Sequence, residues 1–527
     1  TTLSGVNSYT GATVINGGTL LGGNANAFSA ASTTTVNAGG TLDLGGFAQI
    51  INTLTLAGGA VQNGQLGGTI TSTGGTVSGV GGGANLITTG GTTTLSGVNS
   101  YTGATTINGG TLLGGNANAF SAASATTINQ NGTLDLGGLA QSINAVTLAG
   151  GTLTHGLLTG AITSTGGTIS TLGGSAALTT AGGTTTLIGA NSYTGPTNVN
   201  AGTLIVDGSA FSSTMTVKSG ATLAGSGTIG TTTIMNGGTF APGPVGAIGS
   251  MTVAGNLTFQ SGASYQVLVD PTHASSANVT ANQATLAGNV LATFAPGSYI
   301  TKQYTILSAS SIDGAFDNLS TKNLPAGFTA NLSYGANDVY LNLTATLGAP
   351  SPSSPPSLAR ATLVDNAEGG AKAINGYFNS GGALPANYLP LFGLTGSSLA
   401  NALMQLSGEA ATGAQQSAFR LTNLYLALML DPLVYGGGAA GGSAPFGFGA
   451  GGTAMRLAAE EAQSPEIALA YAKLLRSPAT PAAGFIPEPR WNVWTGGYGG
   501  ANRIAGDSTW IGSHDLSASA GGFAGGG

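Results

Sequence analysis

The residues whose types suit acid–base chemistry are few in this sequence and lie far apart. Three histidines occur in 527 residues, at positions 155, 273 and 514. His514 precedes Asp515, and a histidine beside a carboxylate is the pairing that a general base and its orienting group require. Neighbouring residues of a strand point to opposite faces, so we expect this pair to have a surface or lumen role and not a catalytic one. His155 and His273 fall in segments that read as a turn and a loop.

Two aspartates stand in identical five-residue contexts. Asp43 and Asp135 each occur in the sequence LDLGG, and they are 92 residues apart. Paired carboxylates hydrolyse glycosidic bonds only when they lie within about 10 Å of each other. Two carboxylates separated by a whole repeat do not meet that condition, so we expect no glycosidase site.

Nucleotide, metal and protease motifs are isolated or missing. The segment GSGTIG, residues 225–230, fits the GxGxxG pattern of dinucleotide-binding proteins, yet no strand–turn–helix unit surrounds it. The sequence contains no HExxH, GxSxG or P-loop motif. The aspartates at turns beyond the repeats also lack the regular spacing of a calcium loop; they are Asp270, Asp313, Asp317 and Asp338. We therefore expect no catalytic, cofactor-binding or metal-binding residue, no cofactor, and no enzymatic activity in this chain.

The composition excludes several classes of partner. Glycine accounts for 93 of the 527 residues, and charged residues make up 5%, where about 25% is usual. Before Lys218 the charged side chains are Asp43, Asp135 and Asp207. Nucleic acid and anionic lipid are both bound through lysine and arginine, so we expect no nucleic-acid partner. The chain contains no cysteine, which excludes disulfides and thiolate chemistry.

A long internal repeat organises the first part of the chain. LSGVNSYTG occurs at residues 3–11 and again at 95–103, and LIGANSYTG follows at 187–195. Inside these 92-residue modules, short alternating strands separated by glycine pairs recur in GGTL-like motifs that end at Leu20, Leu42, Leu112, Leu134, Leu204, Leu223 and Phe240. This pattern predicts an all-β fold, a right-handed parallel β-helix over residues 1–345, with modules starting near residues 1, 93 and 185. Stacked coils would bury a Leu/Val/Ile ladder, with Gly and Asn at the corners.

The tyrosines of the nine-residue motif allow two interpretations. Tyr9, Tyr101 and Tyr193 fall at equivalent positions of the three modules. They either pack at a coil corner or form a surface that stacks on carbohydrate. We favour the structural interpretation, because copies that lie a whole module apart are separated by several coils.

The composition changes beyond the repeats. Strand patterns continue at residues 251–269, 303–320 and 333–344. Residues 346–358, which include APSPSSPPS, are predicted to form a Pro/Ser linker, and residues 359–486 a helical and Gly-rich connecting region. Helical spacing is found within this region at residues 359–378, 409–430 and 454–476.

The repeats resemble those of a known protein family. NSYTGATTINGGTLLGG (99–115) and GSGTIGTTTIMNGGTFAPG (225–243) are similar to the passenger-associated repeats of bacterial autotransporters, the type V secretion proteins. Residues 487–527 resemble the opening of the autotransporter β-domain. They contain all three tryptophans of the chain, Trp491, Trp494 and Trp510, and such residues form the interfacial girdles of outer-membrane barrels.

The resemblance implies an anchor in the outer membrane, assembled by the barrel assembly machinery, with a helix inside the pore; residues 454–476 are the natural candidate. Residues 487–527 are too few for the eight strands that a barrel needs, so they are expected to hold a first strand or a hairpin. The chain has no recognisable signal peptide and no apolar run long enough for a membrane helix. We therefore expect an internal piece of a longer protein.

The expected function is that of a passenger stalk, exported to the cell surface or secreted by a Gram-negative bacterium, with adhesion or another surface interaction as its role. One alternative is a carrier stalk for an enzymatic domain upstream of Thr1. The other is a self-associating surface or biofilm protein, favoured by the low charge and the Thr-rich faces of the coils.

Overall fold

The computed structural model describes residues 1–244, 246–270, 274–296, 302–348, 363, 365–408, 494–504 and 516–526, together with a few single positions between 415 and 426. The chain divides into two compact units, and each is described by itself. The first contains residues 1–362 and 368–399, and the second contains residues 363–367 and 400–527.

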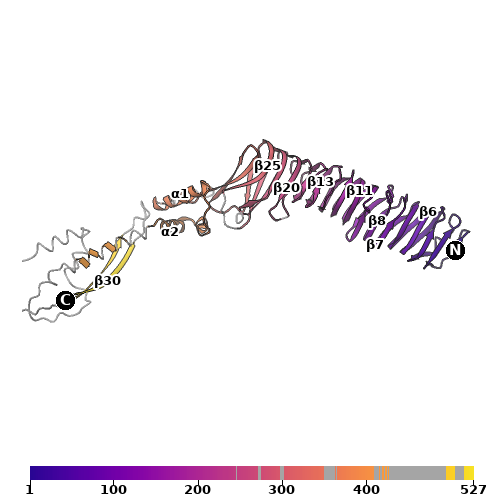
Figure 1. Cartoon of the computed structure of the whole chain (residues 1–527), viewed down its shortest axis with the longest axis horizontal. Coiled ribbons are helices and arrows are strands. Elements are labelled where there is room, and N and C mark those ends of the chain that lie inside the picture. Colours follow the sequence, from indigo (N-terminus) through magenta and orange to yellow (C-terminus); the bar gives the residue numbers. More distant parts are fainter. Residues whose placement is uncertain are drawn as a thin grey trace, which may run out of the picture. The chain divides into compact units, whose positions relative to one another are not determined.

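The first unit is a parallel β-solenoid, whose strands stack as successive rungs in Figure 1. The strands of the first two modules are β1 (Thr2–Leu3), β2 (Thr13–Ile15), β3 (Gly18–Gly22), β4 (Thr33–Asn37), β5 (Gly40–Asp43), β6 (Ala48–Gly81), β7 (Asn85–Leu95), β8 (Thr105–Gly114), β9 (Ala125–Asn129), β10 (Gly132–Asp135), β11 (Ala140–Gly174) and β12 (Ala177–Ile188). All of the pairings among these strands are parallel, as in the pairs β2–β4, β4–β6, β3–β5 and β8–β10.

The solenoid continues through the third module and the coils that follow it. Its further strands are β13 (Thr197–Val206), β14 (Ser209–Ala210), β15 (Met215–Val217), β16 (Thr222–Gly225), β17 (Thr228–Ile229), β18 (Thr232–Ile234), β19 (Thr239–Pro242), β20 (Ser250–Phe259), β21 (Ser264–Asp270), β22 (Ser275–Ser276), β23 (Asn278–Leu286), β24 (Asn289–Phe294), β25 (Gln303–Gly314), β26 (Asn318–Lys322), β27 (Phe328–Tyr334) and β28 (Asp338–Ala345). The predicted all-β parallel solenoid is therefore confirmed.

The GGTL-like motifs set the register between coils. Leu20 pairs with Leu42, and Leu112 pairs with Leu134. In the third module Leu204 pairs with Leu223, which pairs in turn with Phe240. All of these side chains except Leu20 are fully buried. Burying one apolar side chain stabilises a fold by about 1.5–3 kcal/mol, so a slip in register that moved this column to the solvent face would be strongly unfavourable.

One module contains five coils. Thr13 pairs with Thr34, which pairs with Leu54, and Ile70 pairs with Leu86, which pairs with Thr105. One further coil, within β6, leads from Leu54 to Ile70, because a Cβ atom on Gly75 would lie 2.4 Å from the oxygen of Gly59, 16 residues earlier. Thr105 follows Thr13 by 92 residues, which is the module length. At about 4.8 Å per coil, one module therefore advances the solenoid by roughly 24 Å.

Glycine at the corners permits the close approach of successive coils. Gly45 has φ of 70°, and an added Cβ atom would lie 1.8 Å from the carbonyl oxygen of Gly22. Its equivalent, Gly137, has φ of 72°, and a Cβ atom there would lie 1.9 Å from the oxygen of Gly114. A side chain at either corner is excluded both by the left-handed backbone and by the coil below.

Polar side chains inside the coils pair with each other. The hydroxyls of Ser72 and Thr93 lie 2.7 Å apart, and those of Ser164 and Thr185 are at the same distance one module later. All four side chains are buried. Because a buried hydroxyl without a partner costs about 1–3 kcal/mol, these pairs allow serine and threonine to occupy interior positions.

Aromatic side chains replace leucine in the core of the coils after the repeats. Phe240, Phe259, Tyr265 and Phe316 contact one another, with ring centroids 5.3–5.9 Å apart. The hydroxyl of Tyr265 donates to the carbonyl oxygen of Ile306. These larger side chains fill a core in which the simple leucine ladder has ended.

Antiparallel pairing marks the end of the solenoid. Strand β28 pairs antiparallel with β25 on one side and with β27 on the other. Three helical segments follow: α1 (Asp365–Asn379), the 3₁₀ segment η1 (Ala386–Gly393) and α2 (Gly396–Leu406). The segment α1 overlaps the helix expected at residues 359–378, whereas η1 and α2 lie in a stretch for which no helix was predicted.

The second unit contains a β-hairpin. Strand β29 (Trp494–Ile504) pairs antiparallel with β30 (Leu516–Gly526) over their whole length. The predicted linker falls almost entirely outside the described residues, as does the helix expected at 454–476; most of the helix expected at 409–430 is also outside them. That the hairpin belongs to an outer-membrane barrel stays a prediction.

Candidate functional site

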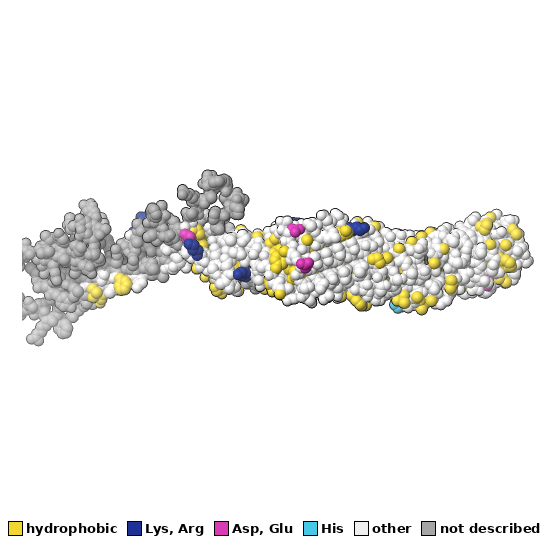
Figure 2. Space-filling view, turned by 90° about the horizontal axis from the view of Figure 1, so that it is seen from above, with side chains coloured by type: hydrophobic (Ala, Val, Ile, Leu, Met, Phe, Trp, Pro, Cys, Tyr) yellow, Lys and Arg dark blue, Asp and Glu magenta, His cyan; other side chains and the backbone are white. Residues whose placement is uncertain are grey.

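The outer surface of the solenoid carries few charges. Figure 2 shows a face that is mostly white, the colour of uncharged polar side chains and backbone, with most of the visible Lys, Arg, Asp and Glu atoms outside the N-terminal half. In residues 1–206 the charged side chains are Asp43 and Asp135. A catalytic or metal site in the repeats would therefore have to be built around these two carboxylates.

Asp43 lies at the corner that follows β5, where amide groups hold its carboxylate. Oδ1 accepts hydrogen bonds from the Gly45 N–H at 2.8 Å and from Asn63 Nδ2 at 3.1 Å, and Oδ2 accepts one from Gln62 Nε2 at 2.9 Å. Burial would raise the pKa of Asp43, but the hydrogen bonds from Gln62, Gly45 and Asn63 outweigh it and lower that pKa. The carboxylate thus stays ionised and serves to close the turn.

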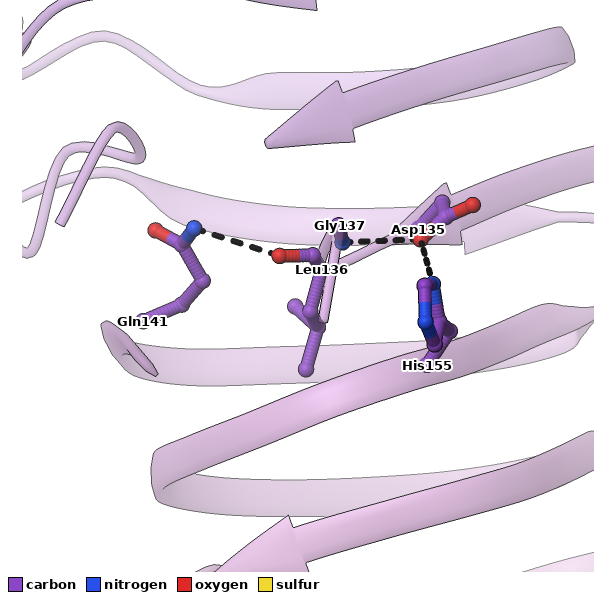
Figure 3. A network of polar contacts seen from close by, with 5 residues as sticks. All are labelled: Asp135, Leu136, Gly137, Gln141 and His155. Carbon is purple, nitrogen blue, oxygen red and sulfur yellow. Dashed lines mark hydrogen bonds and ion pairs between the residues drawn. The ribbon is translucent and has the colours of Figure 1, made fainter. Parts of the chain in front are cut away.

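Asp135 occupies the same corner one module later, with a histidine as its partner (Figure 3). Its Oδ1 accepts a hydrogen bond from the Gly137 N–H at 2.8 Å and lies 3.3 Å from His155 Nδ1. The His155 side chain is 62% exposed. A surface histidine beside one carboxylate has the groups of a general base, but a nucleophile and an oxyanion site are also needed for acyl transfer.

Sequence reasoning missed the contact between Asp135 and His155, because it assigned the histidine to a variable turn. The module length contains the signal that would have found it. His155 follows Asn63 by 92 residues, as Asp135 follows Asp43. The histidine therefore replaces an asparagine in a structural corner.

The two aspartates do not form a pair of catalytic carboxylates. They are separated by one module, so about 24 Å of solenoid lies between them. Glycosidases of either stereochemistry need carboxyl groups within about 10 Å of each other.

The tyrosines of the nine-residue motif are interior residues in two of the three modules. Tyr101 and Tyr193 are 2% and 1% exposed, and their hydroxyls lie 3.1 and 2.8 Å from the hydroxyls of Thr105 and Thr197. Burial raises the pKa of each phenol to about 12. A ring that is enclosed in this way cannot stack on a sugar. Tyr9 is half-buried.

The first residue of the GSGTIG segment forms backbone hydrogen bonds with a later coil of the solenoid. The Gly225 N–H donates to Gly243 O at 3.1 Å, and the Gly243 N–H donates to Gly225 O at 2.7 Å. Residues 222–225 and 228–229 belong to strands β16 and β17. A dinucleotide site needs free N–H groups at the start of a helix, and these residues offer neither.

Other candidate residues cannot be placed. His273, His514, Asp515, Trp491 and Trp510 lie outside the described residues. Across the part of the chain that the structure describes, no three His, Cys, Asp or Glu side chains gather as metal ligands would. Within the same residues, no helix has the length and the apolar character needed to cross a bilayer.

The geometry defines a class of protein, a parallel β-solenoid built from long repeated modules. Comparison with known protein families shows which repeats these modules are similar to. The model of the passenger-associated transport repeat matches residues 1–21, 90–113 and 182–206, which is the start of each module. The start of each module is thus similar to the transport repeats found in autotransporter passengers.

Part of the chain is also similar in sequence to a known protein. An extracellular serine protease of Serratia marcescens is 33% identical in an alignment of 168 residues that covers 30% of this chain. The match covers 16% of the length of that protease. The similarity therefore concerns a small part of the relative.

Proposed function

We propose that the solenoid is the stalk of an autotransporter, exported and displayed at the surface of a Gram-negative cell, where it takes part in adhesion or another surface interaction. The observation that carries the proposal is the position of the three passenger repeats. They stand at the starts of modules that stack into one continuous parallel solenoid. A solenoid of this kind gains length and surface with each module and needs no enclosed site.

The chemistry of the repeats supports a role in display. Residues 1–206 contain no lysine or arginine, so the chain has little electrostatic attraction to nucleic acid or to anionic lipid. The two aspartates of the repeats are both engaged at corners. These features favour a stalk that does not catalyse a reaction in this part of the protein.

We further propose that residues 487–527 belong to an outer-membrane β-domain and that the barrel assembly machinery inserts it. The antiparallel pairing of β29 with β30 supports this assignment, because such barrels are built from antiparallel neighbours. The solenoid is proposed to be right-handed, as almost all parallel crossover connections are.

A carrier role for an enzyme is the second candidate. It is favoured by the similarity to the Serratia protein, which is an extracellular serine protease. In that case the catalytic domain would lie elsewhere in the protein and the solenoid would present it. A third candidate, a self-associating surface protein, is supported by the uncharged faces of the coils.

Surface labelling of living cells tests the proposed display. An epitope inserted near Ser100, whose side chain is exposed, is followed in the full-length gene product. We expect antibody to label intact cells and a protease added outside to remove the label. Labelling that appears only after the outer membrane is permeabilised would contradict display.

An activity screen separates the stalk from an enzyme. The purified chain is assayed on glycosidic, ester and peptide substrates, with a β-helical lyase as a positive control. We expect no turnover. Turnover that is lost on Asp135→Asn or His155→Ala would overturn the proposal that this chain is not catalytic.

A further inference from the structure

The last strand of the solenoid has an edge that its neighbouring strand does not cover completely. Among the described residues, the pairing of β28 with β25 ends at Asn342 and Gln303, and the Leu343 N–H still donates to Lys302 O at 2.7 Å. The Thr346 N–H points the other way, to Gly327 O at 2.7 Å. By alternation, the next backbone groups on the β25 side belong to Ala345 and Leu347.

Two asparagines of helix α1 take these positions. The Ala345 N–H donates to Asn379 Oδ1 at 2.8 Å, and Asn379 Nδ2 donates to Ala345 O at 3.1 Å. The Leu347 N–H donates to Asn375 Oδ1 at 2.9 Å, and Asn375 Nδ2 donates to Leu347 O at 3.0 Å. A primary amide offers one oxygen acceptor and N–H donors, as a peptide group does. Each asparagine thus pairs with the strand as a residue of a neighbouring strand would.

The spacing of the two asparagines suits this role. Residues four apart on a helix lie on one face and are about 6 Å apart along its axis. Residues two apart on a strand are about 7 Å apart. The helix therefore matches the strand at two successive pairing positions.

Apolar contacts hold the helix in place beside the strand. Phe378, which is fully buried, meets Phe328 edge to face at 5.3 Å, and Phe328 stacks on Phe392 of η1 at 4.5 Å. The ammonium of Lys302 also donates to the carbonyl oxygen of Asn379. The asparagines thus approach the strand from a fixed position.

We propose that α1 is an edge guard, in which Asn375 and Asn379 close the open edge of β28 against strand addition by a second copy of this chain. An uncovered edge with free N–H and C=O groups is a template for another strand. A second copy is the partner that fits, because two identical antiparallel edges pair about a two-fold axis. The structure that closes the solenoid then extends past the last strand, which ends at Ala345, to the end of η1 at Gly393.

Amide exchange at single residues tests the hydrogen bonds. In the full chain, N375A/N379A should accelerate exchange of the Ala345 and Leu347 amides by about tenfold, the effect of losing an acceptor. The Thr346 amide, whose acceptor is Gly327 O just before β27, should be unchanged and serves as an internal control. The matched variant K372A, which removes an exposed ion pair of the same helix with Glu368, should change none of the three.

Sedimentation velocity tests the guard role with the same proteins. N375A/N379A should form dimers at concentrations at which the parent and K372A sediment as before. Unchanged exchange at Ala345 and Leu347 would overturn the strand-like pairing. Faster exchange there without new association would overturn the guard role. Loss of protection along the whole solenoid would also contradict the proposal, since the guard acts at one end only.

Discussion

At the scale of single residues, the corner glycines are the positions where the solenoid tolerates least change. An alanine at Gly137 would have to adopt φ of 72° and would place Cβ 1.9 Å from Gly114 O. We expect Gly137→Ala to lower the free energy of unfolding by about 2–4 kcal/mol, because the left-handed backbone alone costs about 1–2 kcal/mol and the coils must also separate.

The matched control is Gly83→Ala, because no atom lies within 4 Å of a Cβ at that position. Thermal unfolding followed by circular dichroism measures both variants. Equal melting temperatures for the two would mean that the corner relaxes without cost.

The buried tyrosines predict a loss of stability at alkaline pH. Tyr101 and Tyr193 have pKa values raised from 10.0 to about 12 by burial. Between these values the unfolded chain has lost the phenol protons that the folded chain retains. The free energy of unfolding therefore falls as the pH rises from about 10 to about 12, and it is unaffected by these groups below that window.

Chemical denaturation at a series of pH values measures this effect. The variant Y101F/Y193F should show a smaller alkaline loss, while at neutral pH it loses about 1 kcal/mol per hydrogen bond. If the double variant keeps the full alkaline slope, other groups cause it.

Residue-level prediction from the sequence succeeded where one module repeats another. The separation of Asp43 from Asp135 and the interior role of Tyr101 and Tyr193 follow from the 92-residue period. The contact of Asp135 with His155 was missed, because it joins two coils and needs their register. The hydroxyl pair of Ser72 with Thr93 was missed for the same reason, since a polar residue in a strand gives no sign of which face it takes.

At the scale of elements, the β-rich core was predictable and its end was not. GGTL-like motifs carry the register in their leucines, so the stacking of Leu112 on Leu134 could be expected. The docking of α1 could not, because two asparagines and a phenylalanine make the contact and none of them belongs to a repeat. A Pro/Ser segment also reads as a boundary even when the helix that follows it packs back onto the solenoid.

That docking predicts the behaviour of a cut chain. A protease recognition sequence is inserted within residues 349–357, and the purified protein is cleaved. We expect the two fragments to elute together from a native size-exclusion column and apart in denaturant. The physical reason is that Asn375, Asn379 and Phe378 all remain bound to the solenoid after the cut.

The same cut in N375A/N379A provides the control, and its fragments should separate without denaturant. Fragments of the parent that separate under native conditions would show that the helix adds too little to the solenoid to hold the two parts together.

At the scale of the whole solenoid, stability and length add up module by module. Each coil contacts its neighbours only, so an array of such units behaves approximately as a sum of repeats and interfaces. The modular construction of the solenoid can be predicted from the 92-residue period of the sequence. The structure at the C-terminal end of the solenoid could not be predicted from this period, because it is built from non-repeated residues such as Phe259 and Phe316.

Deletion of one complete module tests the central claim, that the passenger repeats form one continuous parallel solenoid that works as a stalk. Removing residues 93–184 joins Thr92 to Thr185, which is equivalent to Thr93. The coils on either side of the junction therefore contact coils equivalent to their original neighbours. Electron microscopy of the parent and the shortened chain measures the length of the rod. We expect a rod of unchanged width that is shorter by roughly 24 Å, five coils at about 4.8 Å each. A change in width, an unchanged length or loss of the rod would contradict it.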